Sequence, residues 1–85
     1  MIKKTITIGL ASGLEARAIA MLVQIASQYE SRIYVENSAA RVNAKSIMGM
    51  MTLSLGAGES ITVSAEGADE DKAMDEIETY LTGEQ

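Results

Sequence analysis

The stretch that decides the fold is Ser60-Ile61-Thr62-Val63-Ser64-Ala65-Glu66, in which polar and apolar residues alternate. Side chains along a β-strand point alternately to opposite faces of a sheet, so this pattern predicts a strand with one apolar and one solvated face. A sheet built from such strands needs cover on its apolar face only. We therefore expect an antiparallel sheet whose helices all lie on one side.

Three further strands are predicted from the same alternation. They lie at residues 2–8, 32–36 and 41–43, and a turn at 37–39 joins the last two as a hairpin. Residues 9–13 and the segment around Gly56 and Gly58 are expected to be loops.

Three helices are predicted between and after the strands. The apolar residues of 16–28 follow a helical period. A short helix is expected at 46–52 with Ser46 as its N-cap, and Asp69 is expected to cap a final helix. The stripe predicted to face the core holds Ala18, Leu22, Ile25 and Ala26 in the first helix and Ala73, Ile77, Tyr80 and Leu81 in the last. The resulting class is α+β, an open-faced β-sandwich of a four-stranded antiparallel sheet with three helices on one face, in the order βαββαβα.

Composition restricts the chemistry that the chain can perform. Its 85 residues allow one domain, spanning 1–85, and contain neither cysteine nor histidine. Disulfides, thiolate nucleophiles and transition-metal sites are thereby excluded, as is histidine acting as a base or phosphoryl acceptor. Because no pocket-forming glycine loop or acid–base pair is present, we expect neither an enzyme nor a bound cofactor.

The distribution of charge also restricts the partners. The formal net charge is −5, and the seven basic residues form no stripe that could follow a phosphate backbone, so direct nucleic-acid binding is not expected. Acidic residues gather after Glu66, where Lys72 is the only basic residue. We find no signal-peptide or membrane-spanning pattern, and we expect a cytoplasmic protein without a membrane partner.

Two segments resemble one known family. They are Gly13-Leu14-Glu15-Ala16-Arg17-Ala18 and Val42-Asn43-Ala44-Lys45-Ser46-Ile47-Met48-Gly49. With the order of elements, they resemble HPr, the phosphocarrier of the bacterial sugar phosphotransferase system, over essentially the whole chain. In that family the first segment reads Gly-Ile-His-Ala-Arg-Pro, and its histidine receives phosphate from phosphoenolpyruvate by way of enzyme I. The resemblance puts Glu15 at the histidine position and Ala18 at the proline position.

The second segment matches the family without change. In Gram-positive members its serine is phosphorylated by HPr kinase/phosphorylase, and the product binds a catabolite control repressor. Crh-type members keep this serine and lack the histidine. The resemblance therefore implies phosphorylation of Ser46 and these two partners, with docking to enzyme I possible without phosphoryl transfer.

The resemblance also implies a partner-binding surface, made of Leu14, Arg17, Ala20, Lys45, Ile47, Met48 and Met51. The guanidinium of Arg17 suits bidentate contact with phosphate. Lys45 is expected to lower the local cost of phosphate at Ser46. Met50, Met21 and Met74 are predicted to lie in the core. For Ile47, Met48 and Met51 the sequence leaves open whether they form a docking patch or part of the core.

The role of Glu15 is left open as well. The amides of residues 16 and 17 have no partner within the helix and favour an anion, so the Glu15 carboxylate is expected to occupy them. There it either mimics a phosphohistidine or only stabilises the start of the helix.

Three functions therefore remain open. The first is a regulatory adaptor phosphorylated on Ser46, and the second is a family paralogue that binds an enzyme as an allosteric subunit without serine phosphorylation. The third is an HPr phosphocarrier altered at its active site. The chain is expected to be a monomer or a strand-exchanged homodimer.

Overall fold

The computed structural model describes residues 1–53 and 55–83. The elements follow the predicted order: β1 (Ile2–Thr7), α1 (Ala16–Ser27), β2 (Arg32–Glu36), β3 (Arg41–Asn43), α2 (Ile47–Met50), β4 (Ser60–Glu66) and α3 (Glu70–Thr82). The predicted bounds of β2, β3 and β4 are confirmed. Strand β1 and helix α1 each end one residue earlier than predicted, and α2 is shorter than the predicted 46–52.

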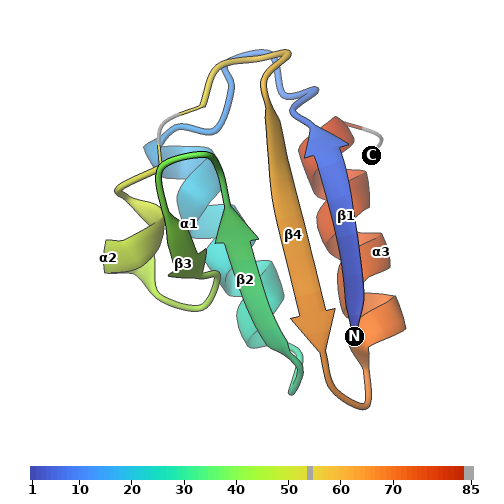
Figure 1. Cartoon of the computed structure of the whole chain (residues 1–85). Helices are drawn as coiled ribbons and strands as arrows, with labels where there is room; N and C mark the ends of the chain where they lie inside the picture. Colours follow the sequence, from blue (N-terminus) through green and yellow to red (C-terminus); the bar gives the residue numbers. More distant parts are fainter. Residues whose placement is uncertain (54, 84–85) are drawn as a thin grey trace.

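The four strands form one antiparallel sheet in the order β1-β4-β2-β3. Strand β4 lies inside the sheet, where Ile61 is opposite Ile6 of β1 and Val63 is opposite Val35 of β2. Figure 1 shows the three helices together on one side of this sheet. The predicted open-faced β-sandwich is therefore confirmed.

The alternation in β4 sorts its side chains between the two faces as predicted. Ile61, Val63 and Ala65 are buried in the core beneath the helices. On the open face, hydroxyl groups pair across the strands, with Thr5 Oγ1 3.4 Å from Thr62 Oγ1. Solvent can hydrate these groups, so this face needs no second layer.

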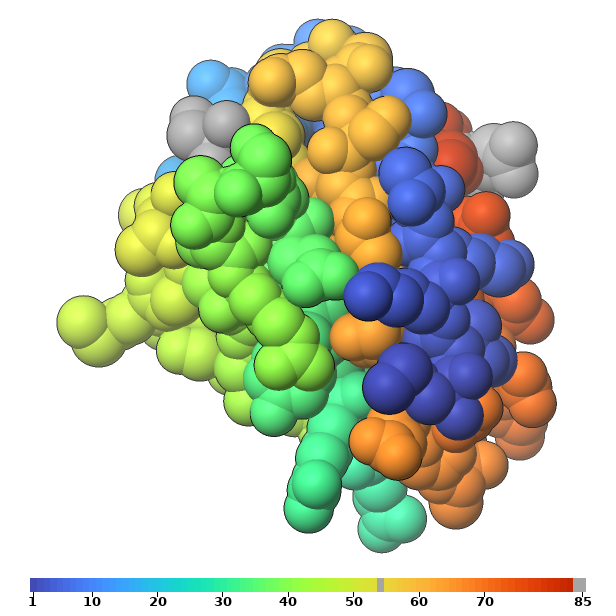
Figure 2. All heavy atoms as spheres, in the orientation of Figure 1, coloured from blue at the N-terminus to red at the C-terminus, as the bar shows by residue number. Residues whose placement is uncertain are grey.

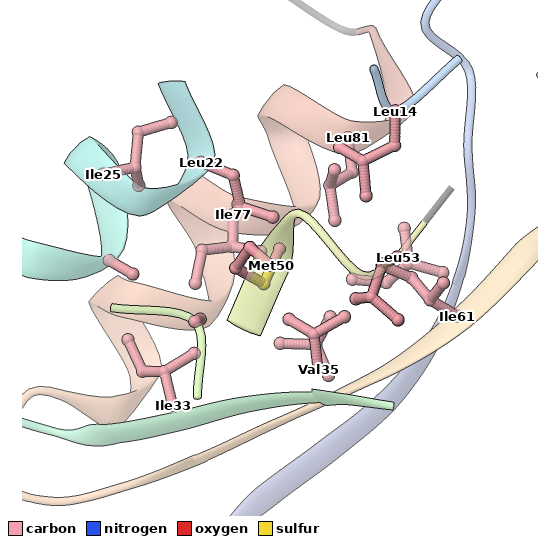
Figure 3. Packing of buried hydrophobic residues seen from close by; sticks show 14 of the residues in the cluster. Leu14, Leu22, Ile25, Ile33, Val35, Met50, Leu53, Ile61, Ile77 and Leu81 are labelled. Atoms are coloured by element: carbon pink, nitrogen blue, oxygen red, sulfur yellow. The ribbon is translucent and has the colours of Figure 1, made fainter. Parts of the chain in front are cut away.

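The core is one contiguous cluster between the sheet and the helices. Figure 3 shows Leu22 of α1, Met50 of α2 and Ile77 of α3 converging above Val35 of β2. All four side chains are almost completely buried. Burial of each such side chain contributes about 1.5–3 kcal/mol to folding.

Several predicted core positions need correction. Met50 and Met74 are buried as predicted, but Met21 is 44% exposed. Met21 lies on the flank of α1, because Leu22 and Ile25 direct the adjacent stripe toward the sheet. Tyr80 and Ala18 are only partly buried, whereas Ile19, which lies outside the predicted stripe of the first helix, is buried.

Asp69 occupies the N-cap position of α3 but does not cap it with its side chain. Its carboxylate instead accepts hydrogen bonds from the backbone N–H groups of Glu30 (2.8 Å) and Ser31 (3.0 Å), and from the Ser31 hydroxyl. These bonds tie the start of α3 to the segment that leads into β2. The Ser31 hydroxyl, followed by the backbone amides, holds the pKa of the Asp69 carboxyl below its usual value of 3.8.

This depressed pKa predicts how stability depends on pH. The charged carboxylate is the form that binds Ser31, so its contribution is complete above the ordinary pKa and is lost as pH falls through the lower folded-state pKa. We expect Asp69→Asn to lower the free energy of unfolding at about pH 7 by weakening this acceptor. The difference from the unsubstituted protein should shrink in urea titrations below pH 3.8. A difference that stays constant with pH would contradict this role of the charge.

Candidate functional site

Backbone hydrogen bonds hold the loop before α1 in place. Gly13 adopts a φ of 73°, and its N–H donates to the Leu10 carbonyl at 2.9 Å. Leu14 N–H then donates to the Leu55 carbonyl at 2.7 Å, in an isolated antiparallel bridge. The side chain of Leu14 is 0% exposed. The prediction that Leu14 belongs to a partner-binding surface is therefore wrong, because this residue anchors the loop to the core.

Glu15 is the N-cap residue of α1 but does not cap it with its side chain. Its backbone is extended, with φ −104° and ψ −175°, and its carbonyl accepts from Ile19 N–H at 2.8 Å. The side chain is exposed. The prediction that the carboxylate occupies the free amides of the helix is therefore wrong. Within residues 1–53 and 55–83, no ion pair joins Glu15 to Arg17.

Glu15 and Arg17 line a hollow of about 410 Å³ at the start of α1. Its wall includes Tyr80 of α3, which the sequence placed only in the core stripe. Desolvation raises the pKa of the Tyr80 phenol, while the positive charge of Arg17 opposes the rise. Tyr80 therefore lies within electrostatic range of Arg17. The amphipathic character of tyrosine, with an apolar ring and a polar hydroxyl, was the signal that could have placed Tyr80 at the edge of the core instead of inside it.

Ser46 is confirmed as the N-cap of α2. Its Oγ accepts a hydrogen bond from Gly49 N–H at 3.2 Å, and its carbonyl accepts from Met50 N–H at 2.9 Å. The residue is exposed. A Cβ at Gly49 would lie 3.4 Å from Ser46 Oγ, an ordinary van der Waals contact, so the space around this residue does not require glycine. The serine hydroxyl is thus accessible while it satisfies a helix amide.

The large apolar residues at positions 47–51, apart from Met50, lie outside the core. Ile47, Met48 and Met51 are 45%, 81% and 54% exposed. Only Met50 of this helix points into the core (Figure 3). We call the three exposed residues the α2 surface, and Figure 2 shows the segment that carries them projecting from one side of the molecule. Ala20 and Arg17 on α1 are exposed as well.

Lys45 has a contact that the sequence did not predict. Its Nζ donates to the Tyr29 carbonyl at 2.6 Å, just beyond the carboxyl end of α1. A cation there satisfies a free carbonyl and suits the negative end of the helix. Lys45 therefore helps to join α1 to the segment before α2. Its effect on phosphate at Ser46 stays a prediction.

The described residues contain neither a metal-binding cluster nor a membrane-spanning helix. No group of three or more acidic, cysteine or histidine side chains in residues 1–53 and 55–83 could hold a metal ion. In the same residues, no helix is both long and apolar enough to cross a membrane.

Comparison with known proteins gives consistent matches. The family model described as "PTS HPr component phosphorylation site" matches residues 2–82. HPr-like protein Crh of Halalkalibacterium halodurans is 42% identical over 84 residues, which cover 99% of this chain and 100% of that protein. The crystal structure of phosphocarrier protein HPr from Bacillus anthracis superposes with a TM-score of 0.89 at 39% identity, covering 94% of this chain and 95% of that one.

Crh of Bacillus subtilis, a catabolite repression protein, is similar as well. Its crystal structure, a dimer with a swapped domain, has a TM-score of 0.78 and 36% identity, over 100% of this chain and 98% of that one. The fold and the matched segments define a small phosphotransferase-system protein of the HPr type. The chain belongs to the HPr family. Its matches to HPr-like protein Crh are consistent with a Crh-type member.

The loop geometry predicts a difference between two glycines. A side chain at positive φ costs about 1–2 kcal/mol, and this cost applies both to Gly13 (φ 73°) and to Gly58 (φ 89°). A Cβ at Gly13 would also lie 2.5 Å from the Leu55 carbonyl oxygen, whereas a Cβ at Gly58 would meet nothing within 4 Å. Gly13→Ala should therefore lower the free energy of unfolding in urea more than Gly58→Ala. Equal losses would show that the Leu14–Leu55 bridge moves freely.

Proposed function

We propose that this chain is a regulatory adaptor of the sugar phosphotransferase system, switched by phosphorylation of Ser46. An HPr kinase/phosphorylase adds the phosphoryl group, and the phosphorylated protein binds a catabolite control repressor in the cytoplasm. The observation that carries the proposal is the exposed hydroxyl of Ser46 at the N-cap of α2, in a family member that contains no histidine.

The position of Ser46 suits a phosphate. A phosphoserine carries about −1.5 to −2 charges and three strong acceptor oxygens. At the start of α2 this charge meets the free amides and the positive end of the helix dipole, and Gly49 N–H already points at the serine oxygen. The phosphate can therefore replace the hydroxyl as cap without unfolding the helix.

The surroundings of Ser46 suit recognition by a partner. Ile47 and Met48 follow the serine directly and are exposed, so a partner that contacts the phosphate also covers apolar side chains. Burial of such side chains supplies affinity, while the charged phosphate supplies specificity. Flexible methionine side chains fit partners of different shape. Arg17 is exposed and available as a second phosphate or partner contact.

The residue at position 15 separates this adaptor from a phosphocarrier. By the family resemblance, Glu15 stands where other members carry the phosphoryl-accepting histidine. Its exposed carboxylate makes no hydrogen bond to the start of α1, so it is free to meet a partner. In our proposal enzyme I can dock on this chain but transfers no phosphate to it.

An allosteric subunit without serine phosphorylation is the second candidate. It is favoured by the α2 surface, which is exposed in the unmodified protein. Either function is compatible with a monomer or with a strand-exchanged dimer, because β1 is an edge strand that pairs with β4 alone.

The two candidates are separated by a phosphorylation assay. Incubation with HPr kinase/phosphorylase and ATP should add one phosphoryl group, measured as intact mass and placed on Ser46 by peptide mapping. Ser46→Ala should abolish the gain. Thr52→Val is the matched control, since it removes the hydroxyl at the other end of α2, where Thr52 donates to the Gly49 carbonyl. No gain in mass, or an equal gain in Ser46→Ala, would leave only the second candidate.

A second prediction concerns Glu15. Glu15 lines the same hollow as Arg17. Its negative charge weakens the attraction that Arg17 exerts on an anionic group of the repressor. Two unit charges 4 Å apart interact by about 1 kcal/mol in water, so Glu15→Gln should raise the affinity of the Ser46-phosphorylated protein for the repressor by up to about fivefold. The effect should fall with salt.

The control for this prediction is Glu66→Gln, which removes an exposed acid at the end of β4. Calorimetry or fluorescence titration of the repressor gives the affinities. If Glu15→Gln and Glu66→Gln have the same effect, Glu15 has no specific influence on the binding surface.

A further inference from the structure

An open groove of about 390 Å³ lies between helices α1 and α3. Met21 and Ile25 of α1 and Tyr80 of α3 provide its apolar lining, while Gln24 and Glu76 are among its polar residues. We call this the α1–α3 groove. No residue of α2 lines it, so it is separate from Ser46 and the α2 surface. Tyr80 also borders the hollow that contains Arg17, so the two depressions share a wall.

The lining of the groove exposes apolar side chain to solvent. Met21 is 44% exposed, although most large apolar residues of the chain are buried. Tyr80 is only partly buried, and Ile25 closes the bottom at 7% exposure. An exposed apolar depression with polar residues around it is a common property of binding sites.

The charge of the groove is of one sign. Among the described residues that line it, Glu76 alone is charged. The Tyr29 phenol donates a hydrogen bond to Glu76 Oε1 and thereby orients the carboxylate. Within the described part of the chain, no lysine or arginine forms an ion pair with Glu76. On α3, Asp75 directly precedes Glu76, while Lys72 lies one turn earlier on the same helical face, so the surface beside the groove carries both signs of charge.

We propose that the α1–α3 groove binds a segment of a protein partner in which a large apolar side chain is followed by arginine or lysine. The apolar side chain lies against Met21, Ile25 and Tyr80, and the cation meets Glu76. Because the groove is open to solvent, a peptide can lie in it while its backbone continues beyond both ends. Sites for small molecules usually enclose most of the ligand instead. This contact goes beyond the proposed function, because it requires neither phosphate on Ser46 nor the α2 surface.

The first experiment uses three peptide probes on the full-length ¹⁵N-labelled protein at low salt. They are acetyl-Phe-Arg-amide, acetyl-Phe-Glu-amide and acetyl-Arg-amide. Acetyl-Phe-Arg-amide should shift the amide signals of Met21, Gln24, Glu76 and Tyr80 at millimolar concentration, and the other two should bind at least several-fold more weakly. Equal binding of acetyl-Phe-Glu-amide would overturn the role of charge. Equal binding of acetyl-Arg-amide would show a simple cation site, and shifts confined to α2 or absent would also overturn the proposal.

The second experiment uses a matched pair of variants. Glu76→Gln should weaken binding of acetyl-Phe-Arg-amide about fivefold and remove most of its salt dependence, as expected for one exposed unit-charge contact. Asp75→Asn removes the adjacent acid, which does not line the groove, and should change binding less than twofold. Equal losses in both variants would attribute the binding to the general charge of α3.

Two controls keep the outcome interpretable. Dilution of the unliganded protein should leave the groove signals unchanged; concentration-dependent shifts there would mean that a second copy of this chain occupies the groove, which would overturn the proposal. Phosphorylation of Ser46 should proceed equally in Glu76→Gln. Failure of phosphorylation in the unsubstituted protein would count against the adaptor function and not against the groove.

Discussion

The hydrogen bond between Ser46 Oγ and Gly49 N–H, together with burial of Met50, holds helix α2 in place. A helix of four residues is too short to be stable alone, so its conformation depends on these two contacts. Once Met50 points inward, Ile47, Met48 and Met51 remain on the outside. One local arrangement therefore exposes the serine hydroxyl and places an apolar surface beside it. The proposed switch follows from this geometry, since phosphate added to the cap joins a surface that is already formed.

The rest of the fold positions α2 relative to the start of α1. Strand β4 is paired on both sides, and α3 packs against it, while α1 contacts both α3 and α2. The Leu14–Leu55 bridge joins the loop before α1 to the segment after α2, while Lys45 binds the carbonyl at the far end of α1. These two contacts thus hold the helix that carries Arg17 and the segment that carries Ser46 in a fixed relative position.

The sequence predicted what depends on local periodicity. The alternation of residues predicted the bounds of β4, because one face of this strand is buried and the other is solvated. Ser46 was predicted as the N-cap of α2 because it is an N-cap residue type directly before a helical segment. Contacts between distant segments could not be predicted in this way. Asp69 binds Ser31, Lys45 binds Tyr29, and Tyr80 approaches Arg17, and each depends on how separate elements pack. The exposure of Met48 was also unpredictable, because four residues are too few to define a helical face. The prediction that Met21 lies in the core was wrong, because Met21 stands next to the buried Leu22 on the exposed flank of α1.

The central claim is that phosphate on Ser46 caps α2 instead of unfolding it. The most direct measurement is an amide NMR spectrum of the ¹⁵N-labelled protein before and after phosphorylation by HPr kinase/phosphorylase. The account predicts a large downfield shift and slower hydrogen exchange for Gly49 N–H, with the signals of the core strands unchanged. Loss of the dispersed signals of residues 47–50, or a Gly49 signal that does not move, would contradict it.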